Sequence, residues 1–349
     1  MKYYLFSQDS DIEWIGKIPK DWKILPLKRV SSIVNGSTPD SSNSDFWDGE
    51  IHWITPSDLG LQNGKKLIGD SSRKITRLGL ENCGASLTPK GSILLSTRAP
   101  IGHMAISIFE TCTNQGCKTI VINQEKVDGS YLYYYLLANK QILQSLGQGS
   151  TFIELSSQNL KDFVVIRPSL VEQKAIADYL DRKTAQIDTL IAKKQRQIEL
   201  LQEQQTAIIN QAVTKGLDPS LKMKDSGISW LGHIPEHWNV VNLRWLVNYV
   251  GTGKTPPTSQ QEYYENDDVD WFTPVDLNGH IVLPVASKKI DRLSIEDGQA
   301  PLFSANTVLI GGVGTIGKIG ILLKSASANQ QINAISYNSK FIQSMGHIT

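Results

Sequence analysis

Two glycine-rich motifs in the second half of the chain resemble nucleotide-binding sites. The first is Gly-Thr-Gly-Lys-Thr at residues 251–255, which has the form of the end of a phosphate-binding loop. The first glycine of such a loop would stand at Asn248, and Pro256 and Pro257 prevent the helix that has to follow it. A phosphate-binding loop is therefore not predicted here.

The second motif is Gly-Val-Gly-Thr-Ile-Gly at residues 312–317, which matches the glycine spacing of a dinucleotide-binding fingerprint. That fingerprint needs a helix directly after it, whereas residues 318–321, Lys-Ile-Gly-Ile, have the pattern of a strand. We interpret this motif as a hairpin turn.

Residues for other chemistry are scattered. No two cysteines have the spacing of a zinc pair, and three thiols cannot form an even set of disulfides. The cysteines, expected to be reduced, are Cys83, Cys112 and Cys117. Asp267, Asp268 and Asp270 precede Trp271 in a predicted turn, where a solvated acidic loop is favoured over a metal site. The Asn/Asp-Pro-Pro-aromatic loop of an adenine methyltransferase does not occur, so we predict no catalytic residue, metal or cofactor in this chain.

A duplication organises the chain. Trp-Ile-Gly-Lys-Ile-Pro-Lys-Asp-Trp at residues 14–22 recurs as Trp-Leu-Gly-His-Ile-Pro-Glu-His-Trp at residues 230–238. Further matches follow in the same order: Gly-x-Thr-Pro at 36–39 and 253–256, Trp-x-Thr-Pro-x-Asp-Leu at 53–59 and 271–277, Ile-Gly at 101–102 and 316–317, and Asn-Gln at 114–115 and 329–330. So many ordered matches predict two domains of one fold. Thr349 aligns with Tyr134, so the second copy lacks counterparts of residues 135–216.

Tryptophans recur at equivalent places in both copies. Trp14, Trp22 and Trp53 and their counterparts are able to stack on nucleic-acid bases. Recurrence at fixed positions favours packing in the core or at the entry to a helix.

Residues 169–216 predict one long helix. Ser169 and Glu172 form a capping box at its start, and Gly216 followed by Pro219 ends it. An apolar stripe with helical spacing runs along one face: Ile176, Leu180, Ile187, Ile191, Ile198, Leu201 and Ile208. A helix of about 65–70 Å is too long for a compact domain, so we expect the stripe to pack against a partner helix in a coiled coil.

Short strands are expected at residues 92–96, 104–109, 118–122 and 163–166, and a helix at 131–146. The predicted fold class is α/β: duplicated domains of mixed α/β topology joined by one long coiled-coil-type helix. The domains are residues 1–168, the helix 169–216, and an incomplete second domain at 217–349. Composition is that of a soluble protein, with 40% apolar and 20% charged residues and no apolar run long enough to cross a membrane.

Several of these motifs together resemble the specificity subunits of type I restriction-modification enzymes. They are the repeated Trp-x-Gly-x-Ile-Pro-x-x-Trp, Gly-Ser-Thr-Phe at 149–152, Val-Ile-Arg-Pro at 165–168, and Glu-Gln, Leu-Asp and Ile-Asp at 172–173, 180–181 and 187–188. The resemblance covers nearly the whole chain. It implies two target-recognition domains, each reading half of a bipartite site in double-stranded DNA, separated by two antiparallel helices. The departure is that this chain has one such helix and an incomplete second domain.

The resemblance also implies partners. Modification (methyltransferase) subunits would dock on the helix, carry S-adenosylmethionine and methylate adenine. Restriction (motor-nuclease) subunits would use ATP and Mg²⁺. The chain would then be a non-catalytic protein of the bacterial or archaeal cytoplasm that binds no membrane, and its unpartnered helix predicts self-association.

Candidate DNA-contacting residues come from charge and from comparing the two copies. Between Lys65 and Arg98 seven basic residues face only Asp70 and Glu81, a pattern that also fits a solvated basic face. Residues that differ between copies are expected to read different bases. The candidates are Arg73, Lys74, Arg77, Arg98, His103 and Lys118 in the first copy, and Lys288, Lys289, Arg292 and Lys318 in the second.

Two other functions stay open at this point. One is a fragment of a self-sufficient DNA methyltransferase whose catalytic domain is not included. The other is an adaptor that dimerises through residues 169–216 and binds protein with its globular domains.

Overall fold

The structure is a computed structural model that describes residues 7–337, apart from residues 11, 99, 150–152, 267, 280 and 315. Some residues of the predicted features therefore lie outside the described residues. They are residues 150–152 of the Gly-Ser-Thr-Phe motif, Asp267, Thr315 and the last part of the predicted second domain, 338–349. The chain divides into two compact units, Met1–Gln202 and Glu203–Thr349, named here unit one and unit two.

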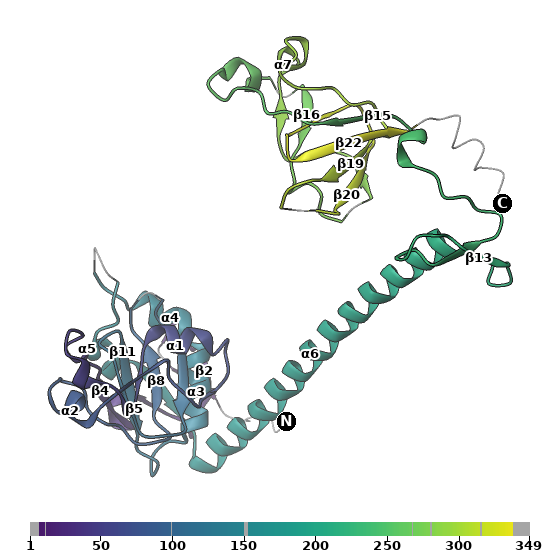
Figure 1. Ribbon diagram of the computed structural model, residues 1–349. Coiled ribbons are helices and arrows are strands. Elements are labelled where there is room, and N and C mark those ends of the chain that lie inside the picture. Colours follow the sequence, from purple (N-terminus) through teal and green to yellow (C-terminus); the bar gives the residue numbers. More distant parts are fainter. Residues whose placement is uncertain are drawn as a thin grey trace. The chain divides into compact units, whose positions relative to one another are not determined.

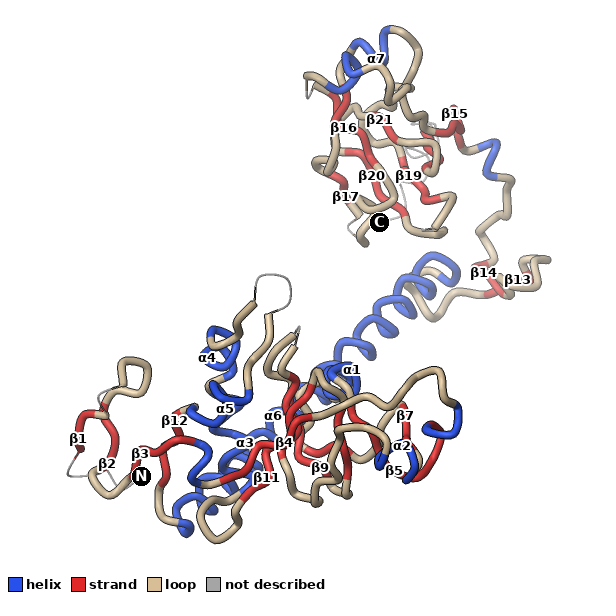
Figure 2. The backbone as a smooth tube through the Cα atoms, turned by 90° about the vertical axis from the view of Figure 1, so that its left-hand side faces the viewer, coloured by secondary structure: helices blue, strands red, loops and turns tan. Residues whose placement is uncertain are grey.

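Unit one is built on a five-stranded sheet (Figures 1 and 2). Its strands, in spatial order, are β4 (Ser31–Asn35), β11 (Cys117–Ile122), β8 (Ile93–Ser96), β9 (Met104–Ser107) and β6 (Leu67–Ile68). β8, β9 and β11 confirm the strands expected at 92–96, 104–109 and 118–122. All residues of β8 and β9 are buried, which explains why these strands are continuously apolar rather than alternating.

A second sheet of three strands carries several of the candidate DNA-contacting residues. Its order is β10 (Thr111–Thr113), β5 (Trp47–Ile54) and β7 (Arg73–Ile75), and β7 leads directly into α2 (Arg77–Glu81). β5 continues into α1 (Pro56–Leu61), which begins with a capping box between Thr55 and Asp58. β7 is at the edge of this sheet, and along it Arg73 is exposed, Lys74 is partly exposed and Ile75 is buried.

Helices and a small sheet close the other side of unit one. The prediction of one helix at 131–146 is wrong in one respect. The structure has two helices there, α3 (Gly129–Ala138) and α4 (Lys140–Ser145), which are divided at Asn139. The Asn139 side-chain amide donates to the carbonyl of Tyr135 at 2.7 Å, a local bond that competes with a continuous helix. The other elements of this side are α5 (Ser157–Asp162), β12 (Val164–Arg167), which pairs with β3 (Lys23–Pro26), and the hairpin β1 (Ser7–Asp9) and β2 (Lys17–Pro19).

The long helix α6 runs from Leu170 to Lys215, 46 residues, as predicted (Figure 1). The capping box is present, because the Ser169 hydroxyl accepts from the Glu172 amide and the Glu172 carboxylate accepts from the Ser169 amide. Gly216 follows the helix with φ +79°, a left-handed conformation that ends helices. Only the first turns pack on unit one, where Gln173 and Ala177 are buried.

Unit two repeats the topology of unit one, which confirms the duplication. Its five-stranded sheet has the order β15 (Val247–Thr252), β22 (Ile332–Tyr337), β19 (Val308–Gly311), β20 (Ile319–Leu322) and β17 (Val282–Leu283). Its three-stranded sheet has the order β21 (Ser327–Ala328), β16 (Val269–Phe272) and β18 (Lys289–Ile290), followed by α7 (Leu293–Glu296). The register of β15 shifts between Val247 and Tyr249, a bulge that accommodates one extra residue of the second copy. The repeated Trp motif lies at the hairpin of β13 (Met223–Asp225) and β14 (His233–Pro235).

Both copies make the same contacts around the Gly-x-Thr-Pro motif. A Cβ on Gly36 would collide with the Asn114 carbonyl, and a Cβ on Gly253 with the Asn329 carbonyl, so both glycines permit a close backbone approach. The Thr38 hydroxyl hydrogen-bonds to Gln115 as that of Thr255 does to Gln330. The motif at 251–255, which resembles the end of a phosphate-binding loop, thus lies at the end of an edge strand, and no helix follows it directly.

The second glycine-rich motif is the connection between β19 and β20, which pair antiparallel. Its prediction as a hairpin is confirmed for the residues that are described.

The tryptophans divide into buried and exposed positions. Trp53 and Trp271 are buried in both units, as core packing predicts. Trp14 is half-exposed and stacks on Phe163 with ring centroids 6.0 Å apart. Its counterpart Trp230 is 82% exposed, so the expectation of core packing is wrong there. Trp14 has the Phe163 ring beside it, whereas the described residues of unit two place no ring in stacking contact with Trp230.

Candidate DNA interface

The edge of the three-stranded sheet in unit one carries a cluster of cations. Arg73 and Lys74 lie on β7, and Arg77 is the first residue of α2. The Arg77 Nε lies 3.4 Å from the Glu81 carboxylate, an exposed pair that contributes little to stability. Arg73 and Lys74 are consecutive on this edge strand, so their side chains leave opposite faces of the sheet, and Arg77 begins the helix that follows.

The guanidinium of Arg73 is held by aromatic rings. Its Cζ lies 3.6 Å from the ring centroid of Trp47 and 5.7 Å from that of Trp53. The two indoles pack edge to face, with centroids 5.1 Å apart and planes at 82°. This arrangement is a cation–π contact that leaves the N–H groups at the edge of the guanidinium open to acceptors. Sequence reasoning missed the aromatic support, because Trp47 lies far from Arg73 along the chain.

Lys74 faces His52 across the sheet, since these residues are register partners of β7 and β5. Burial and the charge of Lys74 lower the pKa of His52, and the weaker attraction of Asp70 opposes them. The His52 ring stacks on Phe109 with centroids 3.9 Å apart. The imidazole is therefore favoured in its neutral form, and the positive charge at this edge belongs to the arginines and Lys74.

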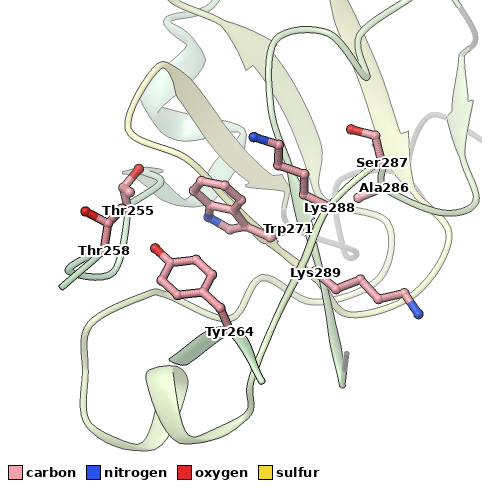
Figure 3. Close-up of a pocket in the computed structure, with 8 residues that line it drawn as sticks. All are labelled: Thr255, Thr258, Tyr264, Trp271, Ala286, Ser287, Lys288 and Lys289. Atoms are coloured by element: carbon pink, nitrogen blue, oxygen red, sulfur yellow. The ribbon is translucent and has the colours of Figure 1, made fainter. Parts of the chain in front are cut away.

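Unit two has cations at the equivalent strand. The Trp271 amide donates to the carbonyl of Lys288, and in unit one Trp53 is the register partner of Arg73. Lys288 therefore corresponds to Arg73, and the next residue, Lys289, corresponds to Lys74. Arg292 stands at the start of α7, as Arg77 starts α2. All three side chains are exposed, and none has an ion pair among the described residues. Figure 3 shows Lys288 and Trp271 among the residues that line a pocket in unit two.

Two other candidates of the first copy are part of an internal ion cluster. Arg98 Nε donates to Glu154 Oε2 at 2.9 Å, and Lys118 Nζ to Glu154 Oε1 at 3.1 Å. The Lys118 side chain is 6% exposed, within β11, so its assignment as a DNA contact is corrected. An ammonium enclosed by the sheet and paired with a carboxylate cannot reach a phosphate. Arg98 is half-exposed, and it shares its charge with Glu154.

The last pair of candidates differs between units. His103 is partly buried, lies before β9 and has its Nδ1 close to Gly60 of α1. Its counterpart Lys318 is exposed and leads into β20. Arg73, Lys74 and Arg77 thus belong to one edge strand and the helix after it, and Lys288, Lys289 and Arg292 to the equivalent segment of unit two, whereas His103 and Lys318 lie on separate turns.

A polar contact that the sequence did not reveal anchors α6 to unit one. Lys66 Nζ and the Tyr134 hydroxyl both donate to Asp181 Oδ1, at 2.5 and 2.6 Å. Burial alone would raise the pKa of Asp181, but the bonds from Lys66 and Tyr134 outweigh it and the pKa is lowered. Lys66, one of the basic residues counted between Lys65 and Arg98, therefore has a structural role.

The apolar stripe of α6 changes its surroundings along the helix. Ile176 packs on the core of unit one, and Leu180 is partly buried. The remaining members are about half exposed in the described chain: Ile187, Ile191, Ile198, Leu201 and Ile208. Packing of these residues against a partner helix stays a prediction.

Metal-binding clusters and membrane-spanning helices are both absent from the described residues. These residues contain no group of three or more His, Cys, Asp or Glu side chains able to hold a metal ion. They also contain no helix that is long and apolar enough to span a bilayer.

These features define a class of protein: two copies of one α/β module, each with a cationic edge backed by aromatic rings, and a long helix with an open apolar stripe. The family model described as type I restriction modification DNA specificity domain matches residues 19–200 and 235–345. The chain belongs to this family.

Relatives agree with the assignment. The chain is 31% identical over 322 residues to the type I restriction enzyme MjaIX specificity subunit of Methanocaldococcus jannaschii, covering 90% of this chain and 70% of that protein. It is 30% identical over 211 residues to the putative type I restriction enzyme MjaX specificity subunit of the same organism, covering 57% of this chain and 44% of that protein. A solved structure concerned with complex assembly and conformational transition of the type I R-M system has the same fold, with TM-score 0.64, 16% identity, and coverage of 92% of this chain and 77% of that chain.

Proposed function

We propose that the chain is the DNA-specificity subunit of a type I restriction-modification complex, in which each unit reads one half of a bipartite target. The observation that carries this proposal is the repetition of the cationic edge. Arg73, Lys74 and Arg77 recur as Lys288, Lys289 and Arg292 on the equivalent strand and helix. Two modules of one fold with equivalent cationic edges suit a ligand that has a uniform phosphate backbone and two separate recognition sequences.

The two classes of contact are assigned by geometry. Lys74 and Lys289 have flexible ammonium groups, which suit phosphates as point charges. Arg73 is held by Trp47, so its guanidinium is oriented before DNA binds, which suits a fixed acceptor such as the N7 and O6 edge of guanine. Lys288 in its place predicts a different base preference in unit two.

Partners are proposed from the helix. The open stripe from Ile187 to Ile208 would bury apolar surface worth about 25 cal/mol per Å² against a modification subunit or a second helix. We propose that modification subunits dock there and carry S-adenosylmethionine. Restriction subunits would contribute the ATP- and Mg²⁺-dependent steps, and the complex would act on DNA in the cytoplasm. The chain itself would supply sequence recognition and no catalytic group.

Binding by the assembled complex tests the proposal. The chain, joined with its modification subunits, is titrated with duplexes that differ at single base pairs, at several salt concentrations. Lys289→Ala is expected to weaken binding of every duplex and to reduce the salt slope by about 1, since each phosphate contact contributes about 1. Lys222→Ala, an exposed lysine far in sequence from the edge, is the control.

A second experiment tests the absence of chemistry. The homogeneous chain is incubated with DNA and S-adenosylmethionine, or with ATP and Mg²⁺. Methyl transfer or cleavage by the chain alone would contradict the proposal that it supplies no catalytic group. Equal affinity for all duplexes would instead favour the adaptor.

A further inference from the structure

Unit two contains a cavity of about 420 Å³ next to its cationic edge (Figure 3). Its walls combine two aromatic rings, hydroxyl groups and the Lys288 side chain, whereas the Lys289 ammonium group points away from the rings in Figure 3. The lining residues used in the argument are Thr255, Thr258, Tyr264, Trp271, Lys288 and Lys289. The volume lies within the range of small-molecule sites, about 300–1,000 Å³.

The same place in unit one shows which shape of group it accepts. The Phe46 carbonyl accepts from the Thr76 amide, as the Tyr263 carbonyl accepts from Asp291, so Trp47 corresponds to Tyr264. In unit one the planar guanidinium of Arg73 stacks 3.6 Å from the ring centroid of Trp47. The chain therefore fills this site itself in unit one with a flat side chain.

Unit two leaves the site open. Tyr264 replaces an indole with a smaller ring, and Lys288 replaces the flat guanidinium with a single ammonium group. The Tyr264 hydroxyl donates to the Pro256 carbonyl at 2.7 Å, and the Trp271 indole N–H donates to the Lys254 carbonyl at 3.1 Å. Both rings are thus fixed by backbone contacts, so the cavity is held open rather than collapsing.

Charge decides which flat group fits. Lys288 has no ion pair among the described residues, so its ammonium group is available to an anion in this cavity. A second guanidinium from a partner protein would meet like charge here. Burial raises the pKa of Tyr264, so its phenol stays neutral and adds no opposing charge. A ligand that combines a flat heterocycle with a negative charge satisfies both the rings and Lys288.

We propose that this cavity binds one nucleotide, with its base against Tyr264 and Trp271 and its phosphate at Lys288. The hydroxyls of Thr258 and Ser287 line the same cavity and are available to the base edge or the sugar. The nucleotide is either free in solution or an unstacked nucleotide of DNA. The site goes beyond reading paired bases, because a base in a duplex cannot place its face against a protein ring.

The test uses the full chain without partner subunits. Tryptophan indoles are labelled with ¹⁵N, the Trp271 signal is assigned with Trp271→Phe, and each deoxynucleoside monophosphate is titrated. Saturable movement of the Trp271 signal is expected. Tyr264→Ala should weaken binding at least about fivefold, the lower limit for loss of one base-stacking contact.

Lys288→Arg is the decisive variant, because it keeps the charge and supplies the guanidinium that fills the site in unit one. Binding of the nucleotide should be lost, whereas a purely electrostatic contact would persist. Lys222→Ala, an exposed lysine outside the cavity, should leave binding unchanged. Circular dichroism and the remaining indole signals check that each variant is folded.

Several outcomes would overturn the proposal. The first is that the Trp271 indole signal does not move with any mononucleotide. The second is that inorganic phosphate binds as tightly as a mononucleotide. The third is that both Tyr264→Ala and Lys288→Arg leave the affinity for the nucleotide unchanged. A duplex with one bulged nucleotide, compared with the same duplex fully paired, identifies the source: binding of the bulged duplex supports a DNA nucleotide, and binding of mononucleotides alone supports a free one. Because no partner subunit is present, failure of the DNA-specificity proposal would leave this titration unaffected.

Discussion

The Nε of Arg98 donates to Glu154 Oε2 at 2.9 Å, while Lys118 occupies the other oxygen of the same carboxylate. Arg98 corresponds to Val313 and Lys118 to Asn333, so neither cation recurs in the second copy. The comparison of copies predicted that such differences reflect the reading of different bases. The ion cluster offers another reason, because both cations are bonded to the Glu154 carboxylate within unit one.

Glu154→Gln is expected to lower the free energy of unfolding by about 1–2 kcal/mol, because it leaves the enclosed Lys118 ammonium without a countercharge and Glu154 itself is partly screened by solvent. Burial alone would raise the pKa of Glu154, but the bonds from Lys118 and Arg98 outweigh it and lower the pKa. This contribution is therefore present at neutral pH and is lost as the pH falls through the folded-state pKa. Urea unfolding measures it, and the exposed Glu125→Gln is the control. Equal stability of the two variants would contradict the role of the cluster.

Lys74→Ala should weaken binding of every duplex by a similar factor and reduce the salt slope by about 1, as expected for loss of one phosphate contact. Lys118→Met should leave the slope unchanged, because the Lys118 ammonium is enclosed. The measurement is binding by the assembled complex across salt concentrations. A change in base preference in Lys74→Ala, without a change in slope, would assign Lys74 to base reading instead.

Stability is expected to depend on His52 below about pH 6.5, its usual pKa. Because burial and Lys74 lower the folded-state pKa of His52, the unfolded chain binds the proton more tightly, and acid favours unfolding. Its stabilising contribution is present at neutral pH and is lost as the pH falls from about 6.5 towards the folded-state pKa. His52→Gln should flatten that part of the stability profile measured by urea unfolding. An unchanged profile would show that the neutral imidazole is not favoured in the fold.

Trp14→Ala is expected to lower the free energy of unfolding by about 1 kcal/mol, because it removes the stacking contact with Phe163. The matched change Trp230→Ala should have almost no effect, since that indole is exposed. Unfolding of both variants under identical conditions gives the comparison. A large loss of stability in Trp230→Ala would mean that the second copy buries this ring against another segment.

The double change Ile187→Asp with Ile191→Asp should weaken association through α6, with itself or with modification subunits, by about tenfold or more, because it removes apolar area from the stripe. Thr189→Asp places one aspartate on the opposite face of the helix and serves as the control, beside the single change Ile187→Asp. Sedimentation velocity measures both interactions. If the wild-type chain stays monomeric at high concentration and binds no modification subunit, the stripe has another role.

Local patterns were enough to predict several elements. The capping box at Ser169 and Glu172 and the terminating Gly216 place both ends of α6 within a residue or two, because these signals act between neighbouring residues. The division of one expected helix at Asn139 was missed, since a single side-chain bond to Tyr135 decides it.

The sequence by itself determined the duplication, the long helix and the family resemblance, because each is recorded as a repeat or spacing along the chain. It also identified the cationic residues of both edges. Only the tertiary structure decided which cations are available. Lys118 and Lys66 are held by Glu154 and Asp181, and Arg73 rests on Trp47. These partners are distant in sequence, so a lysine that faces solvent and one that is enclosed in a sheet have the same appearance until the chain is folded.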